Sequence, residues 1–156
     1  MKMGLHFVVA AILLIIAWTD HKTMKIPTFW NLLLLFCGLC SICLGNKITL
    51  TERIIGMLIV SVPMYGMICL IPGSFGGGDV KLTFVMGLYL GWKQVLTGTF
   101  LAFLIGGTQA MYLLTTGKAK IGTGARMAFG PALCLGYGIA MLFGESLLSW
   151  YLGLFY

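Results

Sequence analysis

The chain has 156 residues, of which 60% are hydrophobic and only 9% are charged, and its formal net charge is +6 at pH 7. Soluble domains carry about 25% charged residues, so this composition excludes an ordinary soluble domain. The basic residues stand in short loops and form no stripe, which argues against nucleic-acid binding and indicates contact with anionic lipid headgroups. We therefore expect a polytopic, all-α integral membrane protein without a nucleic-acid partner.

Six apolar segments are predicted to form transmembrane helices within a single membrane-embedded domain, residues 1–156. They cover residues 4–19, 29–45, 54–72, 79–92, 95–116 and 128–156. Because a membrane-crossing helix needs about 17–25 residues, the fourth is short, and a re-entrant segment is the alternative there. A cleaved signal peptide is the alternative for the first segment, although Ala17-Trp18-Thr19 makes a poor cleavage site.

Small residues repeat at every fourth position in two of these segments. Gly87 and Gly91 form a G-x-x-x-G pattern in the fourth segment, and Ala102, Gly106 and Ala110 continue such a pattern in the fifth. Small residues let membrane helices approach closely, so both patterns predict helix-packing faces. Pro63 lies inside the third segment, where neighbouring groups must satisfy the carbonyl that it frees.

Basic residues predict the orientation of the chain. With six spans, the loops after the first, third and fifth share one face and carry Lys22, Lys25, Lys81, Lys118, Lys120 and Arg126. The opposite face carries Lys2, Lys47, Arg53 and Lys93, the middle two in a loop predicted over residues 46–53. The positive-inside rule therefore assigns the first face to the cytoplasm.

Apolar runs contain all five cysteines, Cys37, Cys40, Cys43, Cys69 and Cys134. The spacing of the first three looks like a metal motif, but a structural zinc site takes four ligands, and no histidine or acid lies nearby. On a helix these three side chains also fan out. We expect ordinary membrane-helix residues, with no metal site, no cofactor and no disulfide.

Asp79 is one of only four acidic residues, and it stands in the stretch G-G-G-D-V-K at residues 76–81, between long apolar runs. An ionisable group beside a bilayer is costly unless it is functional, paired or in contact with water. Gly76, Gly77 and Gly78 carry no side chain, so another backbone can approach them closely. We expect an extended substrate segment to do so, with Lys81 either tuning the acid or reaching a headgroup.

A second acid, Asp20, ends the first apolar segment and begins a predicted loop over residues 20–27. Two full crossings separate Asp20 from Asp79, so both are expected on one face whatever the orientation. Two carboxylates that share a site cannot easily both ionise, so such a pair holds an acid and a base at once, as aspartic proteases do. From the residues alone, the alternative is that each acid pairs with Lys22, Lys25 or Lys81.

The remaining ionisable side chains are weaker candidates for this site. Glu52 and Glu145 fall at or toward the other face. His21 is adjacent to Asp20, but a lone loop histidine is usually solvated.

Both acids lie in recognisable motifs, D-x5-I-P at residues 20–27 and G-x-G-D-x-K-L at residues 76–82. With the stretch F-G-P-A-L at residues 129–133, they resemble the type IV prepilin peptidase family over nearly the whole chain. The resemblance implies that Asp20 and Asp79 are the two catalytic aspartates. One departure is Thr28, which stands where the family usually has Asn, with Asn31 three residues on.

The resemblance also implies a substrate and a place. The substrate is a prepilin or pseudopilin with a short basic leader, a small residue before the cut and an apolar helix after it, cleaved at the cytoplasmic face of the cell membrane. Longer members carry an additional cytoplasmic segment and also methylate the new N-terminus. The first polar loop here has eight residues, 20–27, so we expect peptidase activity without methyl transfer.

Two other functions remain open. A small transporter or scaffold would use polar or broken helices within the membrane, and Gln109 is the main mid-span polar residue, which counts against transport. A protease of the same kind that cuts another signal sequence would differ only in substrate.

Overall fold

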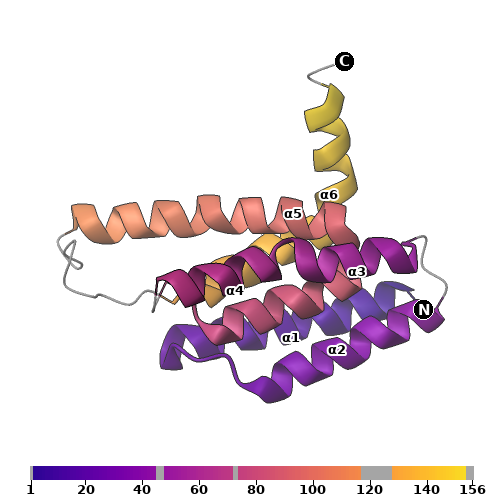
Figure 1. Ribbon diagram of the computed structural model, residues 1–156, viewed down its shortest axis with the longest axis horizontal. Coiled ribbons are helices and arrows are strands. Elements are labelled where there is room, and N and C mark those ends of the chain that lie inside the picture. The colour runs from indigo at the N-terminus through magenta and orange to yellow at the C-terminus, as the bar shows by residue number, and fades with distance from the viewer. Residues whose placement is uncertain (1, 45–47, 72–73, 117–127, 154–156) are drawn as a thin grey trace.

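The computed structural model describes residues 2–44, 48–71, 74–116 and 128–153. Its helices are α1 (Lys2–Thr23), α2 (Thr28–Cys43), α3 (Leu50–Ile59), α4 (Ser61–Leu70), α5 (Gly77–Thr115) and α6 (Gly130–Gly153) (Figure 1). The described residues contain no strand, and the predicted all-α class is confirmed.

Three stretches are long and apolar enough to cross a membrane, Gly4–Thr23, Leu50–Leu70 and Gly77–Thr115. Two more apolar helices, Thr28–Cys43 and Gly130–Gly144, are shorter. Large apolar side chains such as Phe7, Leu14 and Leu70 are exposed on the outside of the bundle, as contact with lipid requires. The chain is thus a multi-pass membrane protein, and its count of six spans stays a prediction.

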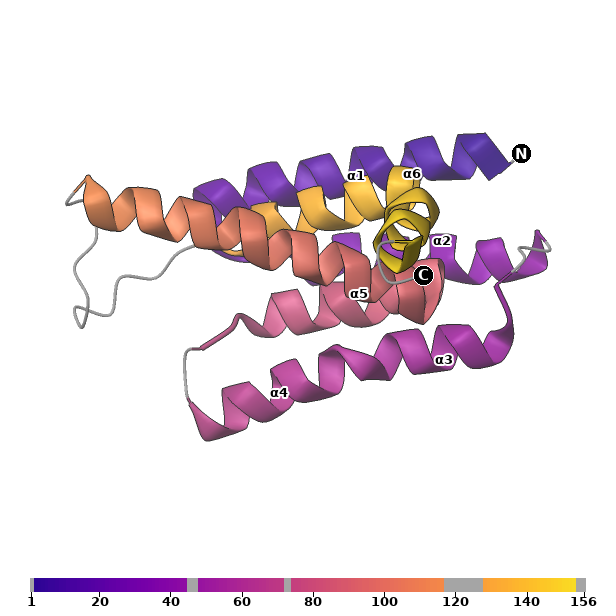
Figure 2. The same cartoon turned by 90° about the horizontal axis from the view of Figure 1, so that it is seen from above.

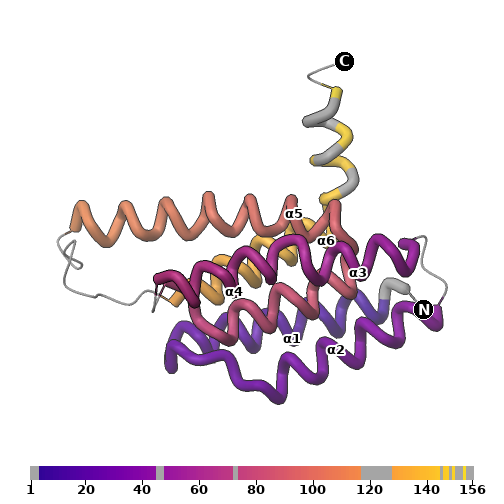
Figure 3. The backbone as a smooth tube through the Cα atoms, viewed as in Figure 1, coloured from indigo at the N-terminus to yellow at the C-terminus, as the bar shows by residue number. Residues whose placement is uncertain are grey.

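The helices gather into a bundle whose two ends differ (Figures 1 and 2). The end of α1 and the beginnings of α2, α5 and α6 lie together at one end, which we call the aspartate end. The beginnings of α1 and α3 lie at the other end. Figure 3 traces the same path and shows the last turns of α6 leaving the bundle. Asp20 and Asp79 therefore belong to the same end, as the predicted number of crossings requires.

α1 is longer than predicted, because it continues to Thr23 and includes Asp20 in its last turn. The helix ends at Met24, whose φ of 52° lies in the left-handed region and whose N–H donates to the Asp20 carbonyl at 2.8 Å. This is a common way for a helix to end. The prediction of a loop over residues 20–27 was wrong by one helical turn.

The predicted third span is broken at Val60 into α3 and α4. Pro63, in the first turn of α4, has no N–H and its ring crowds the preceding turn, which accounts for the break. α3 begins earlier than predicted because of a capping box. The Thr49 N–H donates to the Glu52 carboxylate at 2.9 Å, and the Glu52 N–H donates to the Thr49 hydroxyl at 3.3 Å.

The predicted fourth and fifth helices form one element, α5, whose direction changes at Gly91, with φ 77° and ψ 173° (Figure 1). This backbone conformation is one that glycine adopts readily. Gly87 provides the predicted close helix contact: a Cβ on the facing Gly56 of α3 would lie 2.7 Å from the Gly87 carbonyl oxygen. The predicted packing role is therefore confirmed for Gly87, whereas Gly91 also redirects the chain.

Arg53 was predicted at the end of the loop over residues 46–53, where residues 51–53 were expected to start the next helix; its burial was not predicted. It lies in α3 with only 1% of its surface exposed. Its guanidinium donates to the Leu88 carbonyl at 2.6 Å and to the Ser41 hydroxyl at 2.8 Å. A helix end leaves carbonyls of its last turn without their usual donors, so Arg53 satisfies one of them just before the bend in α5.

Beyond the bend, α5 packs closely against α6. Ala102 and Gly106 are buried, as their spacing predicted, whereas Ala110 is half-buried. A Cβ on Gly136 of α6 would lie 2.8 Å from the Ala102 nitrogen, so the two backbones are in close contact.

Several predicted features lie outside the described residues. They are Lys47, the side chains of Lys2 and Glu145, and the basic loop over residues 117–127 with Lys118, Lys120 and Arg126.

Candidate active site

Asp79 lies in the first turn of α5 and is 6% exposed. Its Oδ2 accepts a hydrogen bond of 3.2 Å from the Gly76 N–H, and its own N–H donates to the Gly76 carbonyl at 3.0 Å. The beginning of a helix carries partial positive charge, which stabilises a carboxylate there. The sequence thus places this acid where an anion is least costly.

Asp20 is 5% exposed and lies in the last turn of α1, where the helix dipole does not favour a carboxylate. A second helix compensates. Gly130, the first residue of α6 and 110 positions away in sequence, donates its N–H to Asp20 Oδ2 at 3.1 Å. Asp20 therefore also sits at a helix N-terminus, although not that of its own helix.

Gly130 approaches Asp20 so closely that no side chain fits between them. A Cβ added at Gly130 would collide with the same Asp20 Oδ2 that accepts the hydrogen bond. Pro131 follows within the first helical turn, where its missing N–H costs nothing. These contacts give the F-G-P-A-L stretch a direct part in holding Asp20.

Asp20 and Asp79 belong to one site, because the glycines that bind them follow Phe129 and Phe75, whose ring centroids are only 5.8 Å apart. Cys134 is buried one helical turn after Gly130 on α6. Two anions in one buried site repel each other, and the two helix N-termini offset part of that repulsion.

The lysines that the structure describes do not hold these acids. Among the described residues, neither carboxylate has a lysine nitrogen within 4.0 Å. Lys22 instead lies over the Trp18 ring, 4.6 Å from its centroid. Lys81 is exposed and lines a groove of about 370 Å³ beside α2, together with Thr28 and Asn31.

The two sequence motifs touch at Ile26. A Cβ on Gly78 would lie 2.9 Å from the Ile26 Cβ, so Gly78 lets the residues after α1 pack directly on the beginning of α5. Gly76 and Gly77 are exposed, and a Cβ on Gly77 would meet nothing within 4 Å. The glycines therefore differ: Gly78 serves internal packing, while Gly76 and Gly77 leave the surface beside Asp79 open.

Three aromatic rings join the segments that hold the two acids. Phe75 directly precedes Gly76, and Phe129 directly precedes Gly130, so each ring is next to an N–H that binds a carboxylate. Their centroids are 5.8 Å apart, and Phe103 of α5 lies 6.1 Å from the first and 5.4 Å from the second. We call Phe75, Phe103 and Phe129 the aromatic cluster.

A buried polar network lies one helical turn along α5 from Asp79, and no sequence pattern predicted it. The Tyr137 hydroxyl donates to Thr83 Oγ1 at 2.9 Å and lies 3.1 Å from Thr99 Oγ1. Thr83 follows Asp79 by four residues, a spacing that could have drawn attention to it, whereas nothing marked Tyr137. Gln109, which the sequence singled out, is half-buried and apart from this network.

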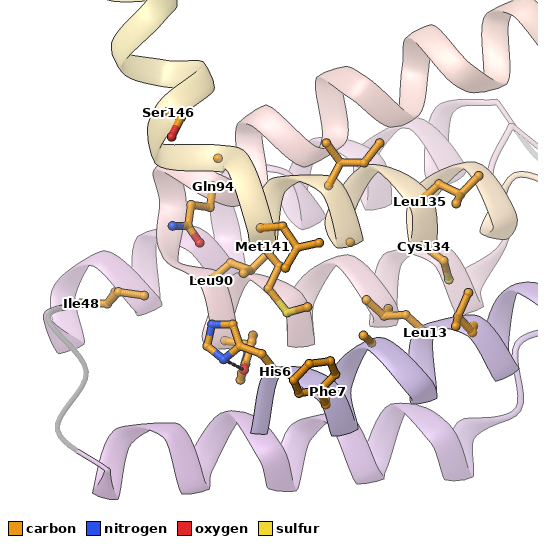
Figure 4. A pocket seen from close by; sticks show the side chains of 17 residues that line it. His6, Phe7, Leu13, Ile48, Leu90, Gln94, Cys134, Leu135, Met141 and Ser146 are labelled. Atoms are coloured by element: carbon orange, nitrogen blue, oxygen red, sulfur yellow. Dashed lines mark hydrogen bonds between the residues drawn. The ribbon is translucent and has the colours of Figure 1, made fainter. Parts of the chain in front are cut away.

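In the described part of the chain, no three His, Cys, Asp or Glu side chains gather to hold a metal ion. Cys37 is buried, Cys40 half-buried and Cys43 exposed, so these side chains spread around α2. A cavity of about 760 Å³ lies between α1, α6 and the bend of α5 (Figure 4). Cys134 lies at one end of this cavity, one helical turn after Gly130.

Residues 7–111, which include both acids, match the model of a family described as the type IV leader peptidase family. The chain belongs to the type IV leader peptidase family. The family resemblance drawn from the two motifs is thus confirmed. No solved structure matches the chain.

Curated members of this leader peptidase family align with most of the chain. A "Prepilin leader peptidase/N-methyltransferase" of Aeromonas hydrophila is 30% identical over 146 residues, which are 90% of this chain and 50% of the relative. Proteins of the same name from Pseudomonas putida and Bacillus subtilis are 28% identical over 140 residues and 35% identical over 80 residues. These matches cover 86% and 51% of this chain, and 48% and 32% of the relatives. The chain spans about half the length of the Aeromonas relative.

Proposed function

We propose that this chain is an aspartic endopeptidase that removes the leader from type IV prepilin-like or pseudopilin precursors at the cytoplasmic face of the cell membrane. The observation that carries the proposal is the acid pair. Asp20 and Asp79 come from distant parts of the sequence, each accepts a hydrogen bond from an N–H at a helix N-terminus, and both are buried in one site.

Such a pair can hydrolyse a peptide bond without a nucleophilic side chain. One carboxylate takes a proton from water as the water oxygen attacks the scissile carbonyl carbon, and the protonated partner donates its proton to the carbonyl oxygen. Collapse of the tetrahedral intermediate breaks the C–N bond. The leaving amine takes a proton from the pair, and a hydroxyl of the intermediate returns a proton to the pair, which is left with one proton as at the start. The two protons belong to the pair jointly, so neither acid is assigned as the base.

The surroundings of the pair suit a peptide substrate. Gly76 and Gly77 are exposed and carry no side chain, so an extended backbone can approach Asp79. The relatives' shared name, prepilin leader peptidase, supports a leader-bearing pilin precursor as the substrate class. Methyl transfer, which that name also mentions, is not part of the proposal.

The test uses membranes that contain this protein and a prepilin with a short basic leader. Asp20→Asn and Asp79→Asn keep side-chain size but remove the ionisable group, and each is expected to lower cleavage by at least about 10³-fold. Glu52→Gln is the matched control: it lies in the α3 capping box, where glutamine is also accepted, and should cleave normally. Mass spectrometry of the pilin N-terminus measures the product.

Full cleavage by either aspartate variant would contradict the acid pair. If the unaltered protein inserts into the membrane but cleaves no precursor, a non-catalytic transporter or scaffold becomes the better hypothesis. If it cleaves only precursors of another kind, the acid pair stands and the substrate class is wrong.

A further inference from the structure

The cavity between α1 and α6 is an elongated groove (Figure 4). Leu13 and Cys134 lie at one end, and His6, Leu90 and Gln94 lie toward the other. Its rim includes side chains that face outward from the bundle, namely Phe7, Leu14, Leu135 and Leu142, each about half to three-quarters exposed. The groove is therefore mostly apolar and opens sideways, toward the lipid. We call it the α1–α6 groove.

Gly138, which lines this groove, packs against none of the described residues. A Cβ added there would meet nothing within 4 Å, in contrast to Gly130 and Gly136 on the same helix. A glycine inside a helix costs roughly 0.5–1 kcal/mol relative to alanine. At Gly138 no neighbour in the described parts of the chain explains the glycine, whereas a second helix entering the groove would use the space.

One end of the groove lies toward the acid pair. Cys134 lines this end, and it follows by one helical turn Gly130, whose N–H binds Asp20. From Cys134 to Gly144, α6 forms one wall for about 15 Å at 1.5 Å per residue. A chain whose scissile bond lies at the pair can therefore continue directly into the groove, and only an apolar, membrane-embedded segment suits its lining.

We propose that the α1–α6 groove binds the apolar helix of the substrate next to the scissile bond, with its closest approach at Gly138. This inference rests on the proposed peptidase function. Continuity with the acid pair favours substrate over a lipid acyl chain or a second copy of this protein, because neither of those needs to begin at Asp20 and Asp79.

The experiment compares two substrates, a full-length membrane-anchored precursor and a short soluble peptide that spans the cut and stops before the apolar helix. Gly138→Leu fills the groove where nothing in the chain obstructs it. It is expected to lower kcat/KM for the precursor by about 10-fold or more, mainly through KM, and to leave the peptide within about 2-fold of the unaltered protein. Gly107→Leu is the matched control, since Gly107 of α5 also has nothing within 4 Å and lies outside the groove.

A photo-crosslinking residue in place of Leu142 gives a second measurement. In an Asp79→Asn background, which retains the uncut precursor, it should crosslink to the apolar segment of that precursor. Crosslinks to lipid alone, or to a second copy of the protein, overturn the inference. The inference is also overturned if Gly138→Leu cleaves the precursor normally, or if it loses cleavage of the precursor and of the short peptide equally. If the unaltered protein cleaves neither substrate, the proposed function itself fails.

Discussion

At the scale of single residues, the contact between Gly130 and Asp20 shows how a backbone group controls a side chain. The Gly130 N–H donates to Asp20 Oδ2 at 3.1 Å, and no Cβ fits at Gly130 beside that oxygen. The position of the Asp20 carboxylate is thus set by the absence of a side chain on another helix. A methyl group there has to displace the carboxylate, the helix, or both.

Gly130→Ala is therefore expected to reduce turnover by about 10²-fold, because a shift of about 1 Å in a catalytic group is enough for such a loss. The measurement is the rate of precursor cleavage by purified protein in detergent or bilayers. Gly107→Ala is the control, since a Cβ there meets nothing within 4 Å. Equal rates for the two variants would show that the Gly130 contact does not position Asp20.

The sequence predicted the two acids better than it predicted their surroundings. Asp20 and Asp79 could be paired by counting apolar segments, because parity does not depend on side-chain detail. Gly130 could not be predicted as a partner of Asp20, because the contact joins residues 110 positions apart and a glycine beside a proline reads only as a helix start. Tyr137 lacked any pattern at all, since its partners are single threonines on another helix.

At the scale of elements, the aromatic cluster links the beginnings of α5 and α6. Phe75 and Phe129 each precede the glycine whose N–H binds one carboxylate, and their ring centroids are 5.8 Å apart. Phe129 also packs on Gly106, where a Cβ would lie 2.6 Å from the ring. The spacing of the two carboxylates therefore depends on how these rings pack.

Phe129→Ala is expected to lower kcat by about 10-fold or more with a smaller change in KM, because the loss acts on the geometry of the acid pair. Stability should fall as well, by about 0.5–1.5 kcal/mol for each lost aromatic pair beyond the loss of burial. Phe129→Leu keeps much of the volume and should recover part of kcat. Phe100→Ala is the control, because Phe100 is 64% exposed on α5. An equal loss of kcat in Phe129→Ala, Phe129→Leu and Phe100→Ala would contradict a positioning role for Phe129.

The bend of α5 marks the limit of pattern-based prediction for these elements. G-x-x-x-G spacing correctly predicted the contact of Gly87, but a repeat of small residues does not encode the φ of 77° at Gly91. Arg53 was assigned to a loop because charges in membrane proteins usually mark loops. The burial of Arg53 is explained by its hydrogen bond to the Leu88 carbonyl, which belongs to a different helix and could not be paired with Arg53 from the sequence.

At the scale of the whole molecule, the burial of Arg53 changes the charge balance between the two ends. Lys22, Lys25 and Lys81 are exposed near the aspartate end. Four basic residues were predicted at the opposite end, and the structure describes the side chains of two of them. Arg53 is buried and hydrogen-bonded, and Lys93 is exposed. A buried arginine is not a free loop charge, so the asymmetry is larger than the sequence alone indicated.

This asymmetry predicts that the aspartate end faces the cytoplasm. Lys25→Cys and Lys93→Cys place single thiols near the two ends, in a background where the exposed Cys43 and Cys69 are replaced by serine. A membrane-impermeant maleimide applied to intact cells should label Lys93→Cys at least about 10-fold more than Lys25→Cys, and permeabilised cells should show both labelled. The reverse pattern would place Asp20 and Asp79 at the outer face, where a leader that stays in the cytoplasm cannot reach them. Cleavage of cytoplasmic leaders and the labelling pattern must therefore agree, because the same end of the bundle determines both.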